Sequence, residues 1–259
     1  MKKEYEQQYH CLEEEHWWFQ SRRQLVRHLV MTGTARRDAR ILEIGCSGGP
    51  LMQQLQREGY QHITGIDISS EAIALCKQRN LRDVHVMDAQ RPAFPDEHFD
   101  LLTASDVLEH LADQELAVHE WWRVLKPGGQ VIIFVPAFRF LWSEHDTANH
   151  HFRRYRRREL VELLDAHHFA VERSSYWNFL LFFPIALVRL VQKVFPPRRH
   201  AQSRGDLFKP PEVINGLLAW LLRCENRLMR WGVDFPFGVS AMVVGRKRTG
   251  GEGTPARCP

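Results

Sequence analysis

The chain has 259 residues, enough to bury one substantial core in one or two domains. Hydrophobic residues make up 44% and charged residues 25%, which are ordinary values for a globular protein. The net charge of +4 is mild and gives no sign of the clustered basic face of a nucleic-acid-binding protein. Five cysteines without Cys-x-x-Cys spacing fit a reducing compartment better than a disulfide framework. Because the first residues also lack the apolar core of a signal peptide, we expect a cytoplasmic location.

In chain order, the pattern predicts a helix over residues 4–31 and then alternating strands and helices. The strands are expected near 41–44, 63–67, 84–89, 99–105, 130–136, 169–176 and 239–246, and the helices near 49–58, 70–79, 113–125, 158–168 and 211–231. Ser69-Ser70-Glu71 is typical of a helix start, because a serine side chain caps free amides. This alternation indicates an α/β fold.

The most informative feature is a pair of strand ends. Residues 41–49 read Ile-Leu-Glu-Ile-Gly-Cys-Ser-Gly-Gly, a short apolar strand with an acid and then a glycine-rich turn. Residues 63–67 read Ile-Thr-Gly-Ile-Asp, a second apolar strand that ends in an acid. Glycines let the backbone approach a ligand closely, and an acid after the second strand suits a ribose hydroxyl pair. The two segments predict a nucleotide-type site at the carboxyl ends of two parallel strands.

The turn itself helps to identify the ligand. A nicotinamide site would need Gly-x-Gly-x-x-Gly, but the turn that starts at Gly45 has Ser47 at its third position and Pro50 at its sixth. With Glu43 in front, it resembles the acid-x-Gly-x-(Gly or Ser)-x-Gly motif of the S-adenosylmethionine (SAM)-dependent methyltransferases with a Rossmann-like fold. Ser47 replaces the commoner glycine of that motif. For this segment alone, an ordinary tight turn between a strand and a helix is the alternative.

Further motifs strengthen the resemblance over roughly residues 40–136. After the glycine turn come a strand that ends in Asp88-Ala89, a strand over 99–105 followed by Asp-Val-Leu-Glu-His at 106–110, and a Leu-Lys-Pro-Gly-Gly turn at 125–129. Flanking segments resemble one branch of the family whose acceptor is not firmly assigned. These segments are His16–Arg23, Leu141–Asp146 and His151–Tyr155.

The resemblance implies a Rossmann-like sheet of seven mostly parallel strands, with helices on both faces. Its last strand would be antiparallel and inserted between the fifth and the sixth. The implied cofactor is SAM, and the implied cofactor-binding residues are Glu43, Gly45, Ser47, Gly49, Asp67, Ile68, Asp88, Ala89 and Ser105. The two glycines would admit the methionine and ribose portions, and Asp67 would take the ribose hydroxyls. Ile68 would flank adenine, and Asp88 with Ala89 would read its amino edge.

Residues 177–237, between the sixth and last strands, form an insertion that is longer than the hairpin of a minimal family member. Residues 179–188 contain no polar side chain, and residues 211–231 form an amphipathic helix. The apolar face of this helix holds Val213, Ile214, Leu217, Leu218, Leu221, Leu228 and Trp231. We therefore expect an N-terminal helical lid (1–35), a SAM-binding core (36–176), the insertion (177–237), a last core strand (238–247) and a flexible tail (248–259).

Three interpretations of the insertion stay open. It can be a cap packed on the catalytic domain, or a cap that also forms a pocket for a hydrophobic acceptor. It can also lie on a membrane surface, with Arg189, Lys193, Arg198 and Arg199 at the lipid headgroups. The apolar run at 179–188 is too short to span a bilayer by itself.

Histidines are the candidate catalytic residues. Methyl transfer from SAM depends mainly on alignment, because the sulfonium is already a strong electrophile. An oxygen acceptor must also lose a proton, for which histidine is a natural base. His110 follows the fourth strand at the expected mouth of the site, with a structural role as the alternative. His145, His150 and His151 lie on the loop after the fifth strand and are further candidates for a base or a substrate ligand.

The candidate acceptor-binding residues are Trp18, Arg22, Arg154 and Tyr155. Trp18 belongs to an aromatic segment that can close over the cofactor as a lid or simply pack on the sheet edge. The five arginines within 153–158 suit recognition of a phosphate or carboxylate, or form a solvated helix face.

Metal binding is not expected. The histidines after the fifth strand and Asp146 are suitable ligand types. They lack the dense Cys/His spacing of a structural zinc site, however, and methyl transfer to many acceptors needs no metal.

The sequence thus predicts a SAM-dependent methyltransferase that acts on a small or lipid-like acceptor at oxygen. No nucleic-acid partner is expected, and peripheral membrane contact through 177–237 stays open. The alternatives are an NAD-dependent oxidoreductase, a SAM-binding or membrane-surface protein without turnover, and a methyltransferase acting on protein or RNA.

Overall fold

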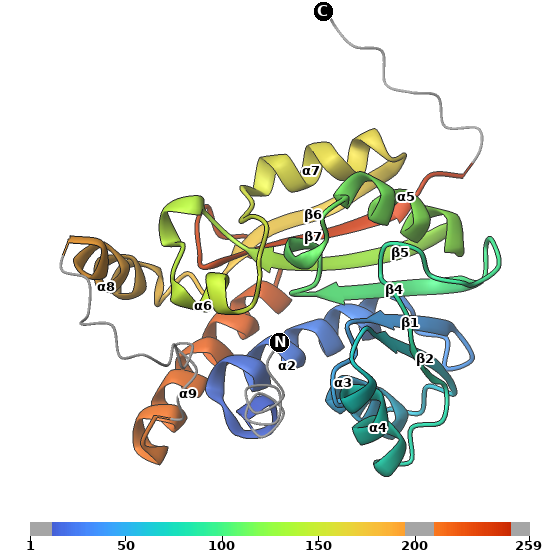
Figure 1. The fold of residues 1–259 in the computed structure, drawn as a ribbon, viewed down its shortest axis with the longest axis horizontal. Helices are drawn as coiled ribbons and strands as arrows, with labels where there is room; N and C mark the ends of the chain where they lie inside the picture. The colour runs from blue at the N-terminus through green and yellow to red at the C-terminus, as the bar shows by residue number, and fades with distance from the viewer. Residues whose placement is uncertain (1–11, 195–209, 250–259) are drawn as a thin grey trace, which may run out of the picture.

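The computed structural model of the chain describes residues 12–194 and 210–249 (Figure 1). Its helices are α2 (Trp17–Gly33), α3 (Pro50–Arg57), α4 (Ser70–Gln78), α5 (Gln114–Val124), α6 (Glu144–Ala148), α7 (Arg157–Ala166), α8 (Phe182–Val194) and α9 (Glu212–Arg230), with 3-10 turns η1 (Leu108–His110) and η2 (Arg139–Leu141). Its strands are β1 (Arg40–Ile44), β2 (His62–Asp67), β3 (Val84–Val86), β4 (Phe99–Ser105), β5 (Leu125–Pro136), β6 (Phe169–Trp177) and β7 (Ser240–Lys247). The helix predicted over 4–31 is interrupted at His16, which has an extended backbone: residues 12–15 are helical, and α2 runs from Trp17 to Gly33. The residues before 12 lie outside the described part of the chain.

The seven strands form one sheet in the order β3-β2-β1-β4-β5-β7-β6. Strands β1 to β5 pair in parallel, whereas β7 is antiparallel to both β5 and β6. The last strand therefore lies between the fifth and the sixth, which confirms the topology that the resemblance implied. The third strand is shorter than predicted, because only Val84–Val86 pair with β2.

Helices cover both faces of the sheet (Figure 1). Helices α5 and α7 pack on one face, where they meet Val131, Ile133 and Val135 of β5. Helices α2, α3, α4 and α9 lie with the other face, which carries Ile132 and Phe134. Successive strand residues point to opposite faces, so a strand that is covered on both sides has to be apolar at every position. This explains the uninterrupted apolar run of β5 and places a hydrophobic core on each side of the sheet.

The carboxyl ends of the parallel strands share one edge of the sheet, which is where ligands bind in open α/β folds. Strand β1 ends there in the glycine turn that leads into α3, and β2 ends in Asp67 before α4. The Oγ of Ser69 accepts a hydrogen bond from the N–H of Ala72 at 3.1 Å, so the predicted serine cap of α4 is confirmed. The local sequence thus directs both acids and the turn to the same edge.

The helix expected over 211–231 is present as α9, but it packs through an unexpected face. Its buried residues are Ala219, Leu222, Glu225, Asn226 and Met229. They lie against α2, where the Asn226 amide donates to the carbonyl of Ser21 at 2.8 Å. The residues that the sequence analysis grouped as the apolar face are mostly exposed, and only Leu218 and Leu221 are half-buried. The stripe that predicted burial therefore points away from the domain.

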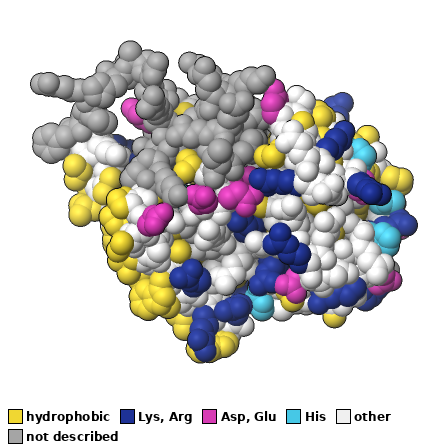
Figure 2. Space-filling model, turned by 90° about the horizontal axis from the view of Figure 1, so that it is seen from below, with side chains coloured by type: hydrophobic (Ala, Val, Ile, Leu, Met, Phe, Trp, Pro, Cys, Tyr) yellow, Lys and Arg dark blue, Asp and Glu magenta, His cyan; other side chains and the backbone are white. Residues whose placement is uncertain are grey.

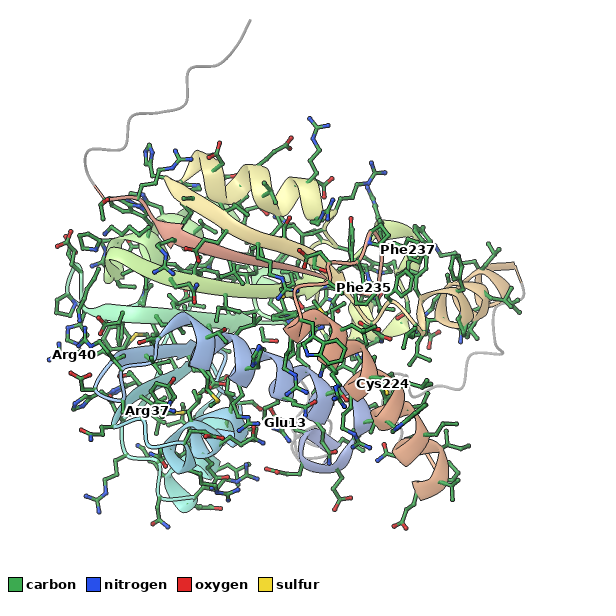
Figure 3. All side chains as sticks on the ribbon, turned by 180° about the vertical axis from the view of Figure 1, so that it is seen from behind. Glu13, Arg37, Arg40, Cys224, Phe235 and Phe237 are labelled. Atoms are coloured by element: carbon green, nitrogen blue, oxygen red, sulfur yellow. The ribbon has the colours of Figure 1, made fainter. Side chains whose placement is uncertain are left out.

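Helix α8 is anchored mainly at its start. The rings of Phe179 and Phe182 lie 4.6 and 5.0 Å from that of Phe237, measured between centroids. Phe182 also packs against Phe138, with ring centroids 5.7 Å apart. Figure 3 shows Phe235 and Phe237 beside the base of this helix. Within the described residues, no helix is both long and apolar enough to cross a bilayer.

Candidate functional site

A large cleft of about 1350 Å³ opens at the carboxyl edge of the sheet. Its walls come from the glycine turn, the ends of β2 and β4, the start of α2, the segment around α6, and helices α8 and α9. A pocket for one small ligand occupies about 300–1,000 Å³, so this cleft has room for two ligands side by side.

The glycine turn adopts a backbone that only a few residue types tolerate. Gly45 and Gly49 have φ angles of 70° and 77°, and Ser47 between them has 49°. A Cβ atom on Gly45 would lie 2.4 Å from a methyl group of Val107. Both this contact and the positive φ angle therefore exclude a side chain at position 45. The serine is a strained substitute for the commoner glycine, at a cost of about 1 kcal/mol. Gly45 and Ser47 line the cleft, whereas Gly49 is buried and is not part of its lining.

Asp67 holds this turn in place. Its carboxylate accepts hydrogen bonds from the backbone N–H of Ser47 at 3.0 Å and from that of Ser69 at 2.9 Å. The side chain lines the cleft and is half-buried. Asp67 therefore both shapes the turn and faces the position of the expected ribose.

Glu43 is the acid in front of the turn, and it is buried beside the cleft. Burial, and next the nearby carboxylate of Glu13, raise the pKa of Glu43 well above its ordinary value. Its Oε2 atom has no hydrogen-bond partner among the described residues. A buried carboxyl group without a partner is costly, and a cationic ligand in the cleft would offset that cost. Glu13, labelled in Figure 3, precedes α2, and its carboxylate accepts from the Ser47 hydroxyl at 2.8 Å.

The residues implied for adenine lie on the rim of the same cleft. Ile68 is 75% exposed, which is unusual for a large apolar side chain unless a ligand covers it. Asp88 is exposed and its Oδ1 accepts from the N–H of Gln90 at 2.8 Å. The carbonyl of Ala89 accepts from the indole of Trp121 at 2.9 Å. Ser105 lines the cleft at the end of β4. All the predicted cofactor-binding residues except the buried Gly49 thus line one cavity.

Arg22 and Trp18 lie on the opposite wall, at the start of α2. The guanidinium carbon of Arg22 lies 4.7, 4.3 and 4.2 Å from the ring centroids of Trp18, Phe134 and Trp177. The same side chain donates to the carboxylate of Asp106 at 3.3 Å. These contacts fix Arg22 against the end of the sheet, where it places a positive charge beside the cleft.

A network of charged hydrogen bonds surrounds Asp146 in α6. Its fully buried carboxylate accepts from His151 Nδ1 at 2.9 Å and from Arg154 Nε and Nη2 at 2.8 and 2.9 Å. Burial alone would raise the pKa of Asp146, but the hydrogen bonds from His151 and Arg154 outweigh it and lower the pKa. An ionised Asp146 fixes the proton of His151 on Nδ1, which leaves Nε2 as the basic nitrogen. His151 lines the cleft, so this pair is arranged as a base with its orienting acid.

His110 lies next to His151, with their ring centroids 4.5 Å apart and their planes at 86°. Desolvation in the cleft wall, followed by the positive charge that His151 can carry, lowers the pKa of His110 to about 4. His110 is therefore neutral at physiological pH. The neighbouring Glu109 is buried, and burial and then Asp106 raise its pKa well above the ordinary value.

One ligand atom each from Glu109, His110 and His151 lies within 4.8 Å of the other two. Two imidazoles and a carboxylate are a ligand set that many divalent metals accept. The sequence pattern offered His145, Asp146, His150 and His151 as ligand types, with no metal expected, and of these four only His151 belongs to this cluster. The structure instead uses Asp146 to bind His151 and Arg154.

Three of the candidate residues occupy positions that do not fit the predicted roles. His150 is exposed and is not part of the cleft lining. Tyr155 is buried in the core, where its hydroxyl donates to Gln114 Oε1 at 3.0 Å, so it does not reach the cleft. Arg154 lines the cleft, but Asp146 and the carbonyl of Ala137 engage its guanidinium. These positions arise because the loop folds back on β5, a tertiary arrangement that the arginine-rich sequence does not encode locally. His145 does line the cleft, beside Asn149.

Two cleft residues were missed by the sequence analysis. Glu109 was passed over beside His110, although a buried acid next to a histidine is a detectable signal. Asn178 gave no signal, because it is an ordinary polar residue before an apolar run. It is fully buried, its φ angle is 62°, and neither side-chain atom has a hydrogen-bond partner among the described residues. It lines the cleft where β6 gives way to the insertion.

Comparison with known proteins identifies a matching family. A family model described as a methyltransferase domain matches residues 42–133, which run from β1 into β5. The ubiquinone biosynthesis O-methyltransferase of Alkalilimnicola ehrlichii is 39% identical over 99 residues, covering 36% of this chain and 40% of that protein. The protein of the same name from Klebsiella pneumoniae (strain 342) is 33% identical over 98 residues, again covering 40% of its length. The chain thus spans about 40% of the length of these curated relatives.

A solved structure is similar over nearly the whole chain. It is a SAM-dependent methyltransferase from Thermotoga maritima, with a TM-score of 0.59, 18% identity, and coverage of 93% of this chain and 94% of that one. At this identity the likeness supports the fold alone.

Proposed function

We propose that the chain is a SAM-dependent methyltransferase, as the methyltransferase-domain match over residues 42–133 supports, and that it transfers the methyl group of SAM to an oxygen atom of a small or lipid-like acceptor. The observation that carries the proposal is that His151, hydrogen-bonded to the buried Asp146, lines the same cleft as the glycine turn and Asp67. A base thereby faces a cofactor site inside one cavity.

The residues of the cleft fit SAM. The cofactor carries a sulfonium and an ammonium group, and the unpartnered carboxyl group of Glu43 suits a ligand with positive charge. Asp67 would hold the ribose hydroxyls, Ile68 would lie under adenine, and Asp88 would accept from its amino group. The turn from Gly45 to Gly49 would lie against the ribose and methionine portion. Bound there, SAM supplies an electrophilic methyl group.

The residues on the acceptor side would remove a proton and stabilise the charge that forms. His151 Nε2 is the proposed base, and it takes the proton of an acceptor hydroxyl. The ionised Asp146 stabilises the imidazolium, and Arg154 keeps Asp146 ionised and oriented. His110 stays neutral and can hold the acceptor oxygen by a hydrogen bond. This division of roles supplies the alignment and the general base that oxygen methylation needs.

The acceptor class follows from the walls of the cleft and from the relatives. Leu181, Pro184, Ile185 and Val188 from the start of the insertion make the outer part of the cleft apolar. The two relatives named above are called O-methyltransferases of ubiquinone biosynthesis. An acceptor with a hydroxyl group on an apolar body suits these walls. The cytoplasmic location stays a prediction.

The test is transfer of labelled methyl from SAM into the organic phase of a fractionated cell extract. We expect His151→Ala to lower the initial rate by about 10²–10⁴-fold, because it removes the general base. Calorimetry should give the same SAM affinity for the variant as for the wild type, because His151 lies on the acceptor side. His150→Ala is the matched control, since this neighbouring histidine lies outside the cleft. A His151→Ala rate within a factor of three of wild type would contradict the assignment of the base.

The same methyl-transfer assay tests two alternatives, namely activation of the acceptor by a metal ion and SAM binding without catalysis. If a cation held by Glu109, His110 and His151 activated the acceptor, dialysis against a chelator would abolish transfer and a divalent metal would restore it. We expect transfer to survive that dialysis. A protein that binds SAM but never labels any fraction would support the non-catalytic alternative.

A further inference from the structure

Helix α9 has its polar and apolar residues on unexpected sides. Its buried face carries the polar residues Glu225 and Asn226, which bind backbone and side-chain groups of the domain. The opposite face is an exposed stripe at helical spacing, in which Val213 is 84% and Trp220 54% exposed. The members of the stripe are Val213, Leu217, Trp220, Cys224, Leu228 and Trp231. In water, a helix normally buries such a stripe.

Helix α8 shows the same arrangement. Arg189 and Gln192 lie on its inner side, are hydrogen-bonded to each other at 2.9 Å, and line the cleft. Its outer side carries Phe183, Leu187, Leu190 and Val191, and Leu187 is 62% exposed. We call these residues and the stripe of α9 together the outer apolar face.

The outer apolar face adjoins the mouth of the cleft. Leu181, Pro184, Ile185 and Val188 around the start of α8 and Leu218 of α9 line the cavity, and Val188 is at the same time 52% exposed. Figure 1 places both helices at the end of the molecule where the parallel strands finish, and Figure 2 shows yellow side chains gathered along that side. A large exposed apolar surface is normally covered by a partner. Because this surface leads directly into an apolar cleft, the partner that covers it can also deliver an apolar ligand to the cleft.

We propose that the outer apolar face docks on an anionic lipid bilayer and that the acceptor passes from the bilayer into the cleft. Only the passage of the acceptor into the cleft rests on the proposed function, because docking on the bilayer needs no methyl transfer. Exposed Arg223, Arg227 and Arg230 flank the stripe of α9, and α8 contains no acidic residue. Basic residues beside an exposed apolar stripe are typical of helices that lie in the interface of anionic membranes. Trp220 and Trp231 are the aromatic type that is enriched at that depth.

A second copy of the chain is a weaker candidate for covering this face. In a two-fold dimer the same patch meets itself, so the arginines beside the stripe would approach their own copies. Like charges across an interface oppose association, whereas anionic headgroups would neutralise them. The charge pattern therefore favours the bilayer.

The test is sedimentation of the full chain with vesicles. Vesicles of equal parts phosphatidylglycerol and phosphatidylcholine should bind the wild type, and phosphatidylcholine alone should bind it less. Leu187→Glu combined with Leu217→Glu should lower binding to the anionic vesicles at least tenfold, because it places two charges in the apolar layer. Ala74→Glu with Gln78→Glu on exposed positions of α4 adds the same charges elsewhere and should bind like wild type. Calorimetry with SAM, expected to be unchanged in both variants, reports folding and keeps this result separate from the proposed function.

Cys224 gives an independent readout, because it is exposed on the stripe while Cys46 and Cys76 are buried (Figure 3). An environment-sensitive dye on Cys224, in a chain with Cys11 and Cys258 changed to serine, should move to a less polar environment when anionic vesicles are added. Wild-type protein that stays in the supernatant would overturn the proposal, as would a double glutamate variant that binds like wild type. A dimer that forms without lipid and dissociates in the double variant would assign the face to a second copy instead.

Discussion

At the scale of single residues, the cleft holds polar groups that the fold leaves unpaired. Asn178 is fully buried, and neither its amide nitrogen nor its amide oxygen has a hydrogen-bond partner among the described residues. Glu225 fixes its backbone, because the Glu225 carboxylate accepts from the Asn178 N–H at 2.6 Å. Leaving a buried polar group unpaired costs about 1–3 kcal/mol. A side chain held at that cost beside an acceptor site is suited to bind the acceptor.

We predict that Asn178→Gly slows methyl transfer into the extract roughly 3- to 10-fold at limiting acceptor, the effect of one lost hydrogen bond. The affinity for SAM and the free energy of unfolding should change little, because glycine tolerates the φ angle of 62°. Asn80→Gly is a matched control, since Asn80 has a φ angle of 63° on the surface after α4. An equal loss of rate in both variants would assign the effect to the backbone rather than to the acceptor.

At the scale of elements, α2 couples the stability of the N-terminal segment to pH. His16 caps this helix, with its Nδ1 accepting from the N–H of Trp18 at 3.3 Å. Burial lowers the pKa of His16 to about 4, below the ordinary value of 6.5. The folded protein therefore binds this proton less readily than the unfolded chain. The contribution of neutral His16 to the free energy of unfolding is therefore complete above about pH 6.5, and this contribution is lost as the pH falls toward 4.

We expect His16→Asn to remove this dependence, because asparagine also caps a helix but does not titrate. The wild type should lose up to about 3 kcal/mol relative to the variant between pH 6.5 and pH 4. Denaturant unfolding at several pH values measures the free energy of unfolding of both proteins. The contributions of the other histidines cancel in the difference between the two proteins. Parallel pH profiles for the two proteins would show that His16 is not the responsible group.

The helices and strands also show which features of the fold the sequence could predict. Strands and helices were predictable because their apolar periods are local, and the acids at the ends of β1 and β2 meet because parallel strands end at one edge. The orientation of α9 was not predictable from its apolar stripe, which indicates burial. The opposite face is buried instead, where Glu225 accepts from the N–H of Asn178 and Asn226 binds Trp177 and Ser21. Asn178 depends on Glu225, which lies 47 residues later, and no local pattern reports such a contact.

At the scale of the whole molecule, three parts of the chain converge on one cleft. The N-terminal segment contributes Glu13 and Trp18, the sheet contributes the turn and Asp67, and the insertion contributes Asn178 and the apolar wall. The cofactor side is the part shared with the family model, which covers residues 42–133. The proposed base His151 and the apolar wall come from the loop around α6 and from the insertion, which lie outside that match. This division explains why the cofactor follows from the family while the acceptor does not.

The most direct test of this account is calorimetric titration of the full chain with SAM and, separately, with NAD. We predict that SAM binds at one site per chain and that NAD does not bind. Asp67→Ala should weaken SAM binding by about 1.5–3 kcal/mol, or roughly 10- to 150-fold, because it removes charged hydrogen bonds. Asp38→Ala, at the exposed opposite end of the sheet, should leave it unchanged. Binding of NAD in place of SAM, or equal SAM affinity in Asp67→Ala and wild type, would contradict the central claim.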